Sequence, residues 1–188
     1  MEYIIIANPH SGAGIGMKQF NLLIQYCNEH SLTYSSHSTH YAGEVYQIIK
    51  KLLPSLNANH RIIIIGGDGT LNEAIATFIK FHESIPISYL PAGTGNDFSR
   101  EMNFTHDIPA FMERLNNEMI STLELISYNE KLSHTSGIAL NSLGFGIDAA
   151  ICQLNTLKSK KQKSKLGLNK LSYLTPIINA FKNHKEFQ

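Results

Sequence analysis

The first 120 residues alternate short apolar runs with stretches whose apolar residues recur at helical spacing. Residues 3–7 contain three consecutive isoleucines and residues 61–65 contain four, which is the pattern of parallel strands buried on both faces. Weaker strand patterns occupy residues 32–38 and 86–90. The alternation predicts an α/β fold in which a parallel, Rossmann-like sheet carries helices on both faces.

The helices between these strands are predicted from spacing and from their stop signals. Residues 43–53 form a helical pattern that Pro54 ends, and a further helix is predicted over about 108–119. Thr70-Leu71-Asn72-Glu73 is a capping-box pattern, which predicts that a helix begins there. The predicted apolar faces consist of Phe20, Leu23, Ile24 and Cys27 in one helix and of Leu71, Ile75, Phe78 and Ile79 in another.

The pattern changes after residue 120. Residues 122–127 and 137–143 are strand-like, with no helix between them that could cross over to a parallel neighbour. Two strands do not form a stable sheet alone. We therefore predict an α/β domain over 1–120 and the incomplete start of a second domain over 121–188, with a helical tail over about 149–185.

Composition and cysteine content limit the class of protein. The 188 residues are 43% hydrophobic and 16% charged, which excludes a disordered or collagen-like chain and suits one complete domain plus part of another. Cys27 and Cys152 form no C-x-x-C pair, so neither a disulfide scaffold nor a zinc site is expected. No run approaches the ~18 apolar residues of a membrane span, and the apolar run at the N-terminus is too short for a signal peptide. We expect a cytoplasmic protein whose nine histidines lie in loops or on the surface.

Three polar, glycine-rich loops follow three of the predicted strands, at residues 8–16, 66–73 and 91–97. Ligands of open α/β sheets bind at the carboxyl ends of the strands. Glycine lets the backbone come close to a ligand, and helices that begin after such loops offer free N–H groups to phosphate oxygens. One such loop can be only a tight turn, but three together predict a polyphosphate site. The glycine spacing fits neither the dinucleotide fingerprint nor the Walker-type loop.

Two carboxylates and two hydroxyls in these loops are the candidates for chemistry. Asp68 and Asp97 can meet Mg²⁺ through water or orient an acceptor hydroxyl, as a kinase aspartate does. The alternative is that both only cap the turns that follow them. Thr70 and Thr94 are candidate phosphate contacts, although a Thr70 hydroxyl that caps the helix would leave phosphate binding to the backbone N–H groups.

The three loops together resemble the diacylglycerol kinase catalytic-domain family, which includes bacterial lipid kinases and the sphingosine and ceramide kinases. NAD kinases and 6-phosphofructokinases carry related forms of the G-G-D-G-T core, whereas all three motifs in this order are specific. The resemblance extends from residue 1 to about 150. The motifs that carry it are Asn8-Pro9-His10-Ser11-Gly12, Gly66-Gly67-Asp68-Gly69-Thr70-Leu71-Asn72-Glu73 and Pro91-Ala92-Gly93-Thr94-Gly95-Asn96-Asp97-Phe98.

This resemblance implies an N-terminal nucleotide domain, a C-terminal β-sandwich domain that begins after residue 120, and an acceptor lipid bound between them. It implies ATP-dependent phosphorylation of a lipid hydroxyl in phospholipid biosynthesis, with diacylglycerol as the leading acceptor and Mg²⁺ as the cofactor. Asp68 resembles the acidic residue at the phosphoryl-transfer centre, and Asp97 its partner in a magnesium–water network. The Gly144–Ala149 run, with Asp148, resembles the start of the lipid-binding domain. The implied nucleotide contacts are Asn8, Pro9, His10, Ser11, Gly12, Thr39, Gly66, Gly67, Asp68, Gly69, Thr70, Leu71, Asn72, Glu73, Gly93, Thr94 and Asn96.

Two features depart from the family pattern. Ala13 stands where the family often has a lysine after the Ser-Gly pair. Family members also continue well past residue 188, which suggests a truncated chain or a sheet completed by a partner through a homodimer or a strand swap. Two other functions remain open, namely an NAD kinase and a non-catalytic nucleotide-binding fragment.

Charge is divided unevenly along the chain. Residues 1–150 contain 8 Lys and Arg against 14 Asp and Glu, whereas residues 151–188 contain 8 against 1. Lys158, Lys160, Lys161, Lys163 and Lys165 place five cations within eight residues. Such a cluster suits either peripheral contact with an anionic membrane, at the inner face, or the solvated face of a helix. No motif predicts binding to nucleic acid.

Overall fold

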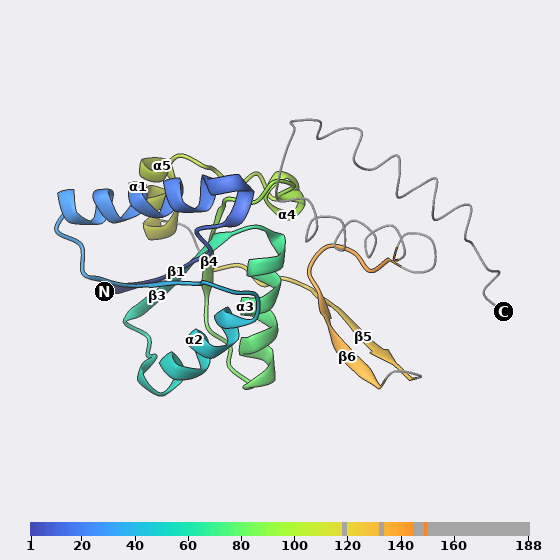
Figure 1. Cartoon of the computed structure of the whole chain (residues 1–188). Coiled ribbons are helices and arrows are strands. Elements are labelled where there is room, and N and C mark those ends of the chain that lie inside the picture. Colours follow the sequence, from blue (N-terminus) through green and yellow to red (C-terminus); the bar gives the residue numbers. More distant parts are fainter. Residues whose placement is uncertain (118–119, 132–133, 145–148, 150–188) are drawn as a thin grey trace, which may run out of the picture. The chain divides into compact units, whose positions relative to one another are not determined.

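A four-stranded parallel sheet forms the centre of the fold in the computed structural model, which describes residues 1–117, 120–131, 134–144 and 149 (Figure 1). The strands lie in the order β2-β1-β3-β4, and each neighbouring pair is parallel. The predicted α/β class and the parallel sheet are confirmed. The strands are β1 (Glu2–Ala7), β2 (Tyr34–Ser38), β3 (His60–Gly66) and β4 (Ile87–Pro91).

Helices cover both faces of this sheet (Figure 1). Helices α1 (Ile15–Glu29) and α5 (Ile108–Asn117) pack on one face, and α2 (Glu44–Leu52) and α3 (Asp68–Lys80) on the other. A short helix, α4 (Asp97–Glu101), follows the loop after β4. Two 3₁₀ turns complete the first part of the chain, η1 (Ser11–Gly14) and η2 (Leu53–Ser55), the second of which contains Pro54.

The core divides into two layers because successive side chains of a strand point to opposite faces. Ile5, Ile63 and Ile65 pack with Leu23 of α1 and Met112 of α5. Their neighbours in sequence, Ile4, Ile6, Ile62 and Ile64, pack instead with Val45 and Ile49 of α2 and with Leu71 and Phe78 of α3. Full burial of one such side chain contributes about 1.5–3 kcal/mol, so the isoleucine runs are the main reason that β1 and β3 are the central strands.

Two details of the predicted helices and histidines are wrong. Ile79, predicted to lie on the apolar face of α3, is 43% exposed, and Ala74 takes part in the core instead. His37 and His60 lie in strands and are partly buried, not in loops. Burial, and then the positive charge of Lys51, lowers the pKa of His37.

An antiparallel hairpin follows the sheet, formed by β5 (Ile126–Glu130) and β6 (Thr135–Ala139). These strands are shifted from the predicted 122–127 and 137–143. The register pairs Tyr128 with Gly137, and the tyrosine ring occupies the space that a side chain on Gly137 would need, since a Cβ there would lie 2.6 Å from the Tyr128 hydroxyl. This cross-strand contact fixes the pairing further along β5 than the sequence pattern alone indicates.

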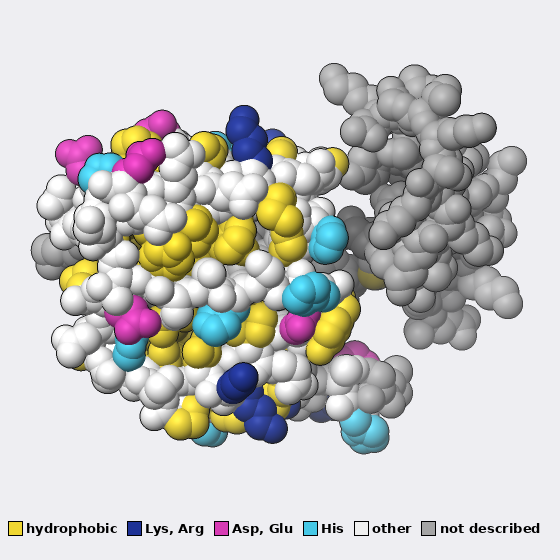
Figure 2. Space-filling view, turned by 60° about the vertical axis from the view of Figure 1, so that its left-hand side comes forward, with side chains coloured by type: hydrophobic (Ala, Val, Ile, Leu, Met, Phe, Trp, Pro, Cys, Tyr) yellow, Lys and Arg dark blue, Asp and Glu magenta, His cyan; other side chains and the backbone are white. Residues whose placement is uncertain are grey.

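The chain forms two units, Met1–Asn141 and Ser142–Gln188. The predicted domain boundary after residue 120 stays a prediction. The expected helical tail, Cys152, Asp148 and the lysine cluster lie outside the described residues. Among the residues that are described, none of the helices has the length and apolar character needed to cross a membrane. On the face drawn in Figure 2, Lys and Arg side chains of the described part lie at the upper and lower margins, whereas histidine and acidic side chains are spread over the face, with an acidic group at the upper left.

Candidate active site

The three glycine-rich loops meet at one edge of the sheet because parallel strands place their carboxyl ends together. Asn8, the first residue after β1, donates its backbone N–H to the Ile65 carbonyl oxygen at 2.8 Å. Its side-chain Nδ2 donates to the Thr70 hydroxyl at 3.3 Å, although the two residues are 62 positions apart. The first loop is therefore joined directly to the second.

Residues 12–14 give the first loop an unusual backbone. Gly12, Ala13 and Gly14 all have a positive φ, at 56°, 54° and 103°. A Cβ on Gly12 would lie 2.4 Å from the Ala92 carbonyl oxygen, so only glycine allows the first loop to approach the third this closely. Asn8 organises the start of the loop, where its Oδ1 accepts from the N–H of His10 at 3.1 Å and its carbonyl oxygen accepts from the Ser11 hydroxyl at 2.8 Å.

The second and third loops are in backbone contact. A Cβ on Gly93 would lie 2.6 Å from the Cα of Gly67, which shows how closely these two glycines pack. Asn96 holds the third loop closed, because its Oδ1 accepts from the N–H of Gly93 at 2.7 Å and its Nδ2 donates to the carbonyl oxygen of Gly93 at 2.8 Å. The Asn96 side chain is therefore used within the protein, although the sequence places it among the candidate nucleotide contacts.

Substitution of Asn96 by Ala is expected to destabilise the fold through the loss of these two hydrogen bonds. Asn103 is a matched control, because it has nearly the same left-handed φ (53° against 52°), is exposed, and makes no side-chain hydrogen bond among the contacts described. We expect Asn96→Ala to lower the free energy of unfolding by about 1–3 kcal/mol more than Asn103→Ala, since each bond contributes about 1 kcal/mol. Urea denaturation measures both variants, and equal losses would show that the Asn96 side chain does not hold the loop.

Asp68 connects the second loop to the start of α4. Its Oδ2 accepts from the N–H of Asp97 at 3.0 Å, and its Oδ1 accepts from the N–H of Phe98 at 3.3 Å. The carboxylate also lies close enough to Tyr89 to act on it: burial, and then the negative charge of Asp68, raises the pKa of the Tyr89 hydroxyl. Asp68 can therefore cap the start of α4 and also meet Mg²⁺ through water or orient an acceptor hydroxyl, because each carboxylate oxygen that accepts one N–H keeps a second lone pair.

Asp97 lies beside Asp68 and is more exposed. Its side chain forms an ion pair with Arg100 one turn further along α4, and both side chains are about 70% exposed. A Cβ on Gly95 would lie 3.7 Å from the Asp97 Oδ2 and 3.8 Å from the Asp68 Oδ2, so the two carboxylates flank one point at the surface of the loop. Mg²⁺ commonly takes one or two carboxylates and fills its other positions with water and phosphate, and this pair fits that requirement. No group of three or more His, Cys, Asp or Glu side chains with metal-binding geometry occurs among the described residues.

The predicted capping box at Thr70 is wrong. Helix α3 begins at Asp68 with Gly67 at the N-cap, so Thr70 is already in the first turn. The carboxylate of Glu73 accepts from the N–H of Tyr46 at 3.2 Å, which links α3 to α2 instead of closing the box. The first N–H groups of a helix have no partner within it, and those of Asp68 and Gly69 therefore stand at the edge of the sheet where a phosphate would approach.

The other predicted site residues differ in how far their side chains are accessible. Leu71 is in the core, so only its backbone could reach a ligand, and its N–H already donates to the Gly67 carbonyl oxygen at 3.1 Å. Thr39, at the end of β2, is buried and donates its N–H to the Ala7 carbonyl oxygen at 2.8 Å. Thr94 and His10 are exposed, whereas Pro9 is buried. The structure brings residues of all three loops together and places Thr39 at the neighbouring strand end, beyond β1.

Two residues that support the site were not expected from the sequence. The Tyr89 hydroxyl donates to the Gly66 carbonyl oxygen at 3.1 Å. A ring nitrogen of His106, Nδ1, lies 3.0 Å from the Pro91 carbonyl oxygen, and the backbone of His106 is held in turn by Gln19 of α1 at 2.9 Å. Tyr89 lies inside a predicted strand, and no sequence signal shows that its hydroxyl reaches the second loop.

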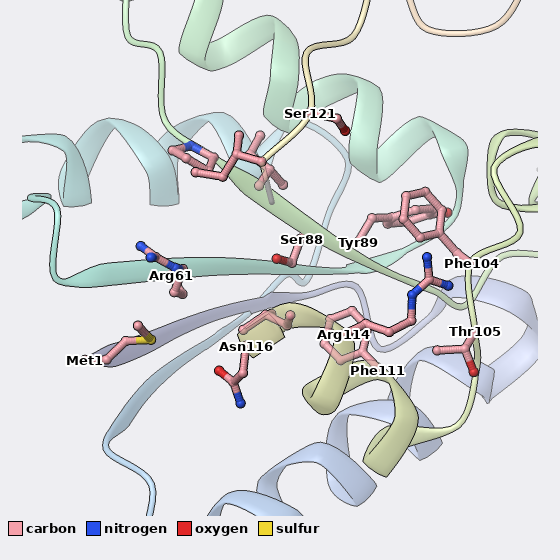
Figure 3. A pocket seen from close by; sticks show the side chains of 14 residues that line it. Met1, Arg61, Ser88, Tyr89, Phe104, Thr105, Phe111, Arg114, Asn116 and Ser121 are labelled. Carbon is pink, nitrogen blue, oxygen red and sulfur yellow. The ribbon is translucent and has the colours of Figure 1, made fainter. Parts of the chain in front are cut away.

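A separate cavity of about 440 Å³ lies along the outer edge of β4 (Figure 3). It is lined by Ser88 and Tyr89 of β4 and by Phe111 and Arg114 of α5, and Arg61 of β3 also lines it. Its lining includes none of the loop residues predicted to bind nucleotide. The candidate active site is therefore the exposed surface formed by the three loops, not this cavity.

Comparison with known proteins agrees with the motifs. The family model described as the diacylglycerol kinase catalytic domain matches residues 2–128. Two curated Staphylococcus aureus proteins, from strains Mu3 and Newman, are each described as "Putative lipid kinase" and are 29% identical over 126 residues, which is 67% of this chain and 38% of each relative. The crystal structure of a Bacillus anthracis protein described as a diacylglycerol kinase superposes with a TM-score of 0.54 and 20% identity, covering 66% of this chain and 42% of that one. The likeness to this structure shows the fold, and the chain spans less than half the length of each of these proteins.

Proposed function

The chain belongs to the diacylglycerol kinase catalytic-domain family, and from this premise we propose that it binds MgATP across its three loops for transfer of the γ-phosphoryl group to a lipid hydroxyl. Diacylglycerol is the proposed acceptor. The proposal includes a cytoplasmic location, a role in phospholipid biosynthesis, and contact of the Lys158–Lys165 segment with an anionic membrane surface.

The observation that carries this proposal is the convergence of the three loops around Asp68. Asn8 contacts Thr70, Gly12 packs against Ala92, and Gly67 packs against Gly93, so the three loops form one surface. The N-terminus of α3 opens onto this surface, and its free N–H groups and positive dipole end suit the oxygens of a polyphosphate. At Gly69, in contrast, no atom lies within 4 Å of the position of a Cβ, so a ligand can lie against the main chain at the start of α3.

The proposed mechanism relies on positioning and on charge, as phosphoryl transfer generally does. We propose that the backbone N–H groups of Asp68 and Gly69 bind phosphate oxygens and that the Asp68 carboxylate, held by the N–H groups of Asp97 and Phe98, faces the transfer centre. Asp68 and Asp97 would hold Mg²⁺ through water, and the bound ion would neutralise charge on the β- and γ-phosphates. Asp97 stays beside Asp68 because its backbone N–H donates to the Asp68 carboxylate, while its own carboxylate forms an ion pair with Arg100.

Calorimetric titration of the chain with MgATP, and separately with NAD, tests the nucleotide part of the proposal. We expect saturable binding of MgATP and no binding of NAD at matched concentrations, because residues 2–128 match the diacylglycerol kinase catalytic domain. If the carboxylate pair takes up the metal, we expect addition of EDTA to weaken ATP binding at least about tenfold, which corresponds to about 1.4 kcal/mol. Binding of NAD in addition to MgATP would favour the NAD kinase interpretation, and binding of neither would contradict the proposed site.

A further inference from the structure

Asn72 lies one turn into α3, in the same motif as Asp68, but its side chain contacts the hairpin. Its Nδ2 donates to the Ile138 carbonyl oxygen of β6 at 3.5 Å. Helix α3 and strand β6 pack against each other, and Leu140, just after β6, packs into the core layer that contains Leu71. The second turn of α3 therefore links the Asp68 loop to the hairpin through direct contacts.

Asparagine is a poor choice for this position if only the helix matters. Its helix propensity is below that of most residues, and Ala is the best former. Its Oδ1 is buried and has no hydrogen-bond partner among the described residues, and a buried acceptor in that state is costly. Local stability of α3 therefore does not explain Asn72, whereas the contact of its amide with β6 does.

We propose that Asn72 is a positioning residue that holds the β5–β6 hairpin against the helix carrying Asp68, so that nucleotide binding at the three loops is transmitted to the hairpin. The consequence for nucleotide rests on the proposed function. The structural link does not, because it depends only on the contact between α3 and β6. In this inference the Asn72 side chain serves the hairpin and not the nucleotide, while the backbone of the motif remains available for phosphate.

Amide hydrogen exchange of the 188-residue chain tests the structural link directly. Asn72→Ala raises the intrinsic stability of α3, so faster exchange in β6 cannot be attributed to a weakened helix. We expect the amides of residues 135–139 to exchange about fivefold faster in Asn72→Ala than in the unmodified chain, the size expected for loss of one modest hydrogen bond. Ile79→Ala is the matched control, since Ile79 is on the same helix and partly exposed, and it should leave exchange in β6 unchanged. Unchanged exchange in Asn72→Ala would overturn the proposal.

MgATP titration of the same variants separates positioning from direct ligand binding. We expect MgATP to slow exchange in β6 of the unmodified chain, and to have no such effect in Asn72→Ala, while its affinity for the variant stays within about threefold, a change of less than 1 kcal/mol. Loss of MgATP affinity with normal exchange in β6 would make Asn72 a nucleotide ligand and overturn the inference. A chain that binds no MgATP at all would contradict the proposed function, while the exchange comparison without nucleotide would still decide whether Asn72 holds the hairpin.

Discussion

Asp68→Asn is expected to lower phosphoryl transfer about 10²–10³-fold and to remove most of the dependence of ATP binding on Mg²⁺, while the fold is retained. The amide of asparagine keeps one oxygen that can accept from the N–H of Asp97 or Phe98, which are the two donors that the carboxylate binds. The negative charge, in contrast, is lost completely. Asparagine therefore separates the structural use of Asp68 from its proposed use in binding metal and positioning the reacting groups, a separation that alanine would not achieve.

Calorimetry with ATP in the presence of Mg²⁺ and of EDTA measures this effect in the chain itself, and transfer to diacylglycerol in mixed micelles measures it in the reaction. Asp107→Asn is a suitable control. Asp107 accepts from the N–H of Ala110 at 3.0 Å at the start of α5, and asparagine is an equally good residue at a helix N-cap. An Asp68→Asn variant that binds MgATP as the unmodified chain does, and turns over at the same rate, would remove Asp68 from the mechanism.

The environments of the two aspartates explain why their effects should differ. Asp68 is partly buried, binds two backbone N–H groups and influences Tyr89, so its position is set by the protein. Asp97 is exposed, and its carboxylate forms an ion pair with Arg100. A carboxylate that the protein already holds in position loses less conformational entropy when a ligand binds. For this reason we assign the larger role to Asp68.

The sheet and its helices could be predicted because burial dominates their sequence. The isoleucine runs in β1 and β3 are apolar at consecutive positions, and only a strand covered on both faces suits them. The shift of β5 and β6 could not be predicted in the same way. It depends on the fit between Tyr128 and Gly137 across the hairpin, and the strand pattern of either segment alone does not contain this information.

The candidate site, too, could be predicted only in part from the sequence. Glycine-rich loops after strands predict where a ligand approaches, since that follows from topology. The partners of individual side chains are set by distant residues: Thr70 meets Asn8, and Glu73 meets Tyr46, so the local capping pattern misassigned both. Sequence spacing could not show that Asn96 closes its own loop. An asparagine whose side chain bonds to its own loop and one whose side chain is free for a ligand cannot be told apart from the sequence.

The contact between Gly67 and Gly93 leads to the second large expected effect. A methyl group on Gly93 would lie 2.6 Å from both the Cα of Gly67 and the Oδ1 of Asn96, so one of the two loops must move. Overpacking of this kind costs about 1–3 kcal/mol, which corresponds to a fall in melting temperature of about 4–12 °C for a unit of this size. We expect Gly93→Ala to show that fall and to bind MgATP at least about tenfold more weakly, because the Gly67 backbone leads directly into the start of α3.

Gly95→Ala, two residues further along the same loop, makes the same chemical change without the clash. Its Cβ would lie 3.7 Å or more from its nearest neighbours, which is ordinary van der Waals contact. We therefore expect its melting temperature to stay within about 2 °C of that of the unmodified chain, since surface substitutions usually change stability by less than 0.5 kcal/mol. Equal melting temperatures for the two variants would show that the loops are not in close contact in solution. A normal MgATP affinity in a destabilised Gly93→Ala would show instead that the contact supports the fold but does not shape the phosphate site.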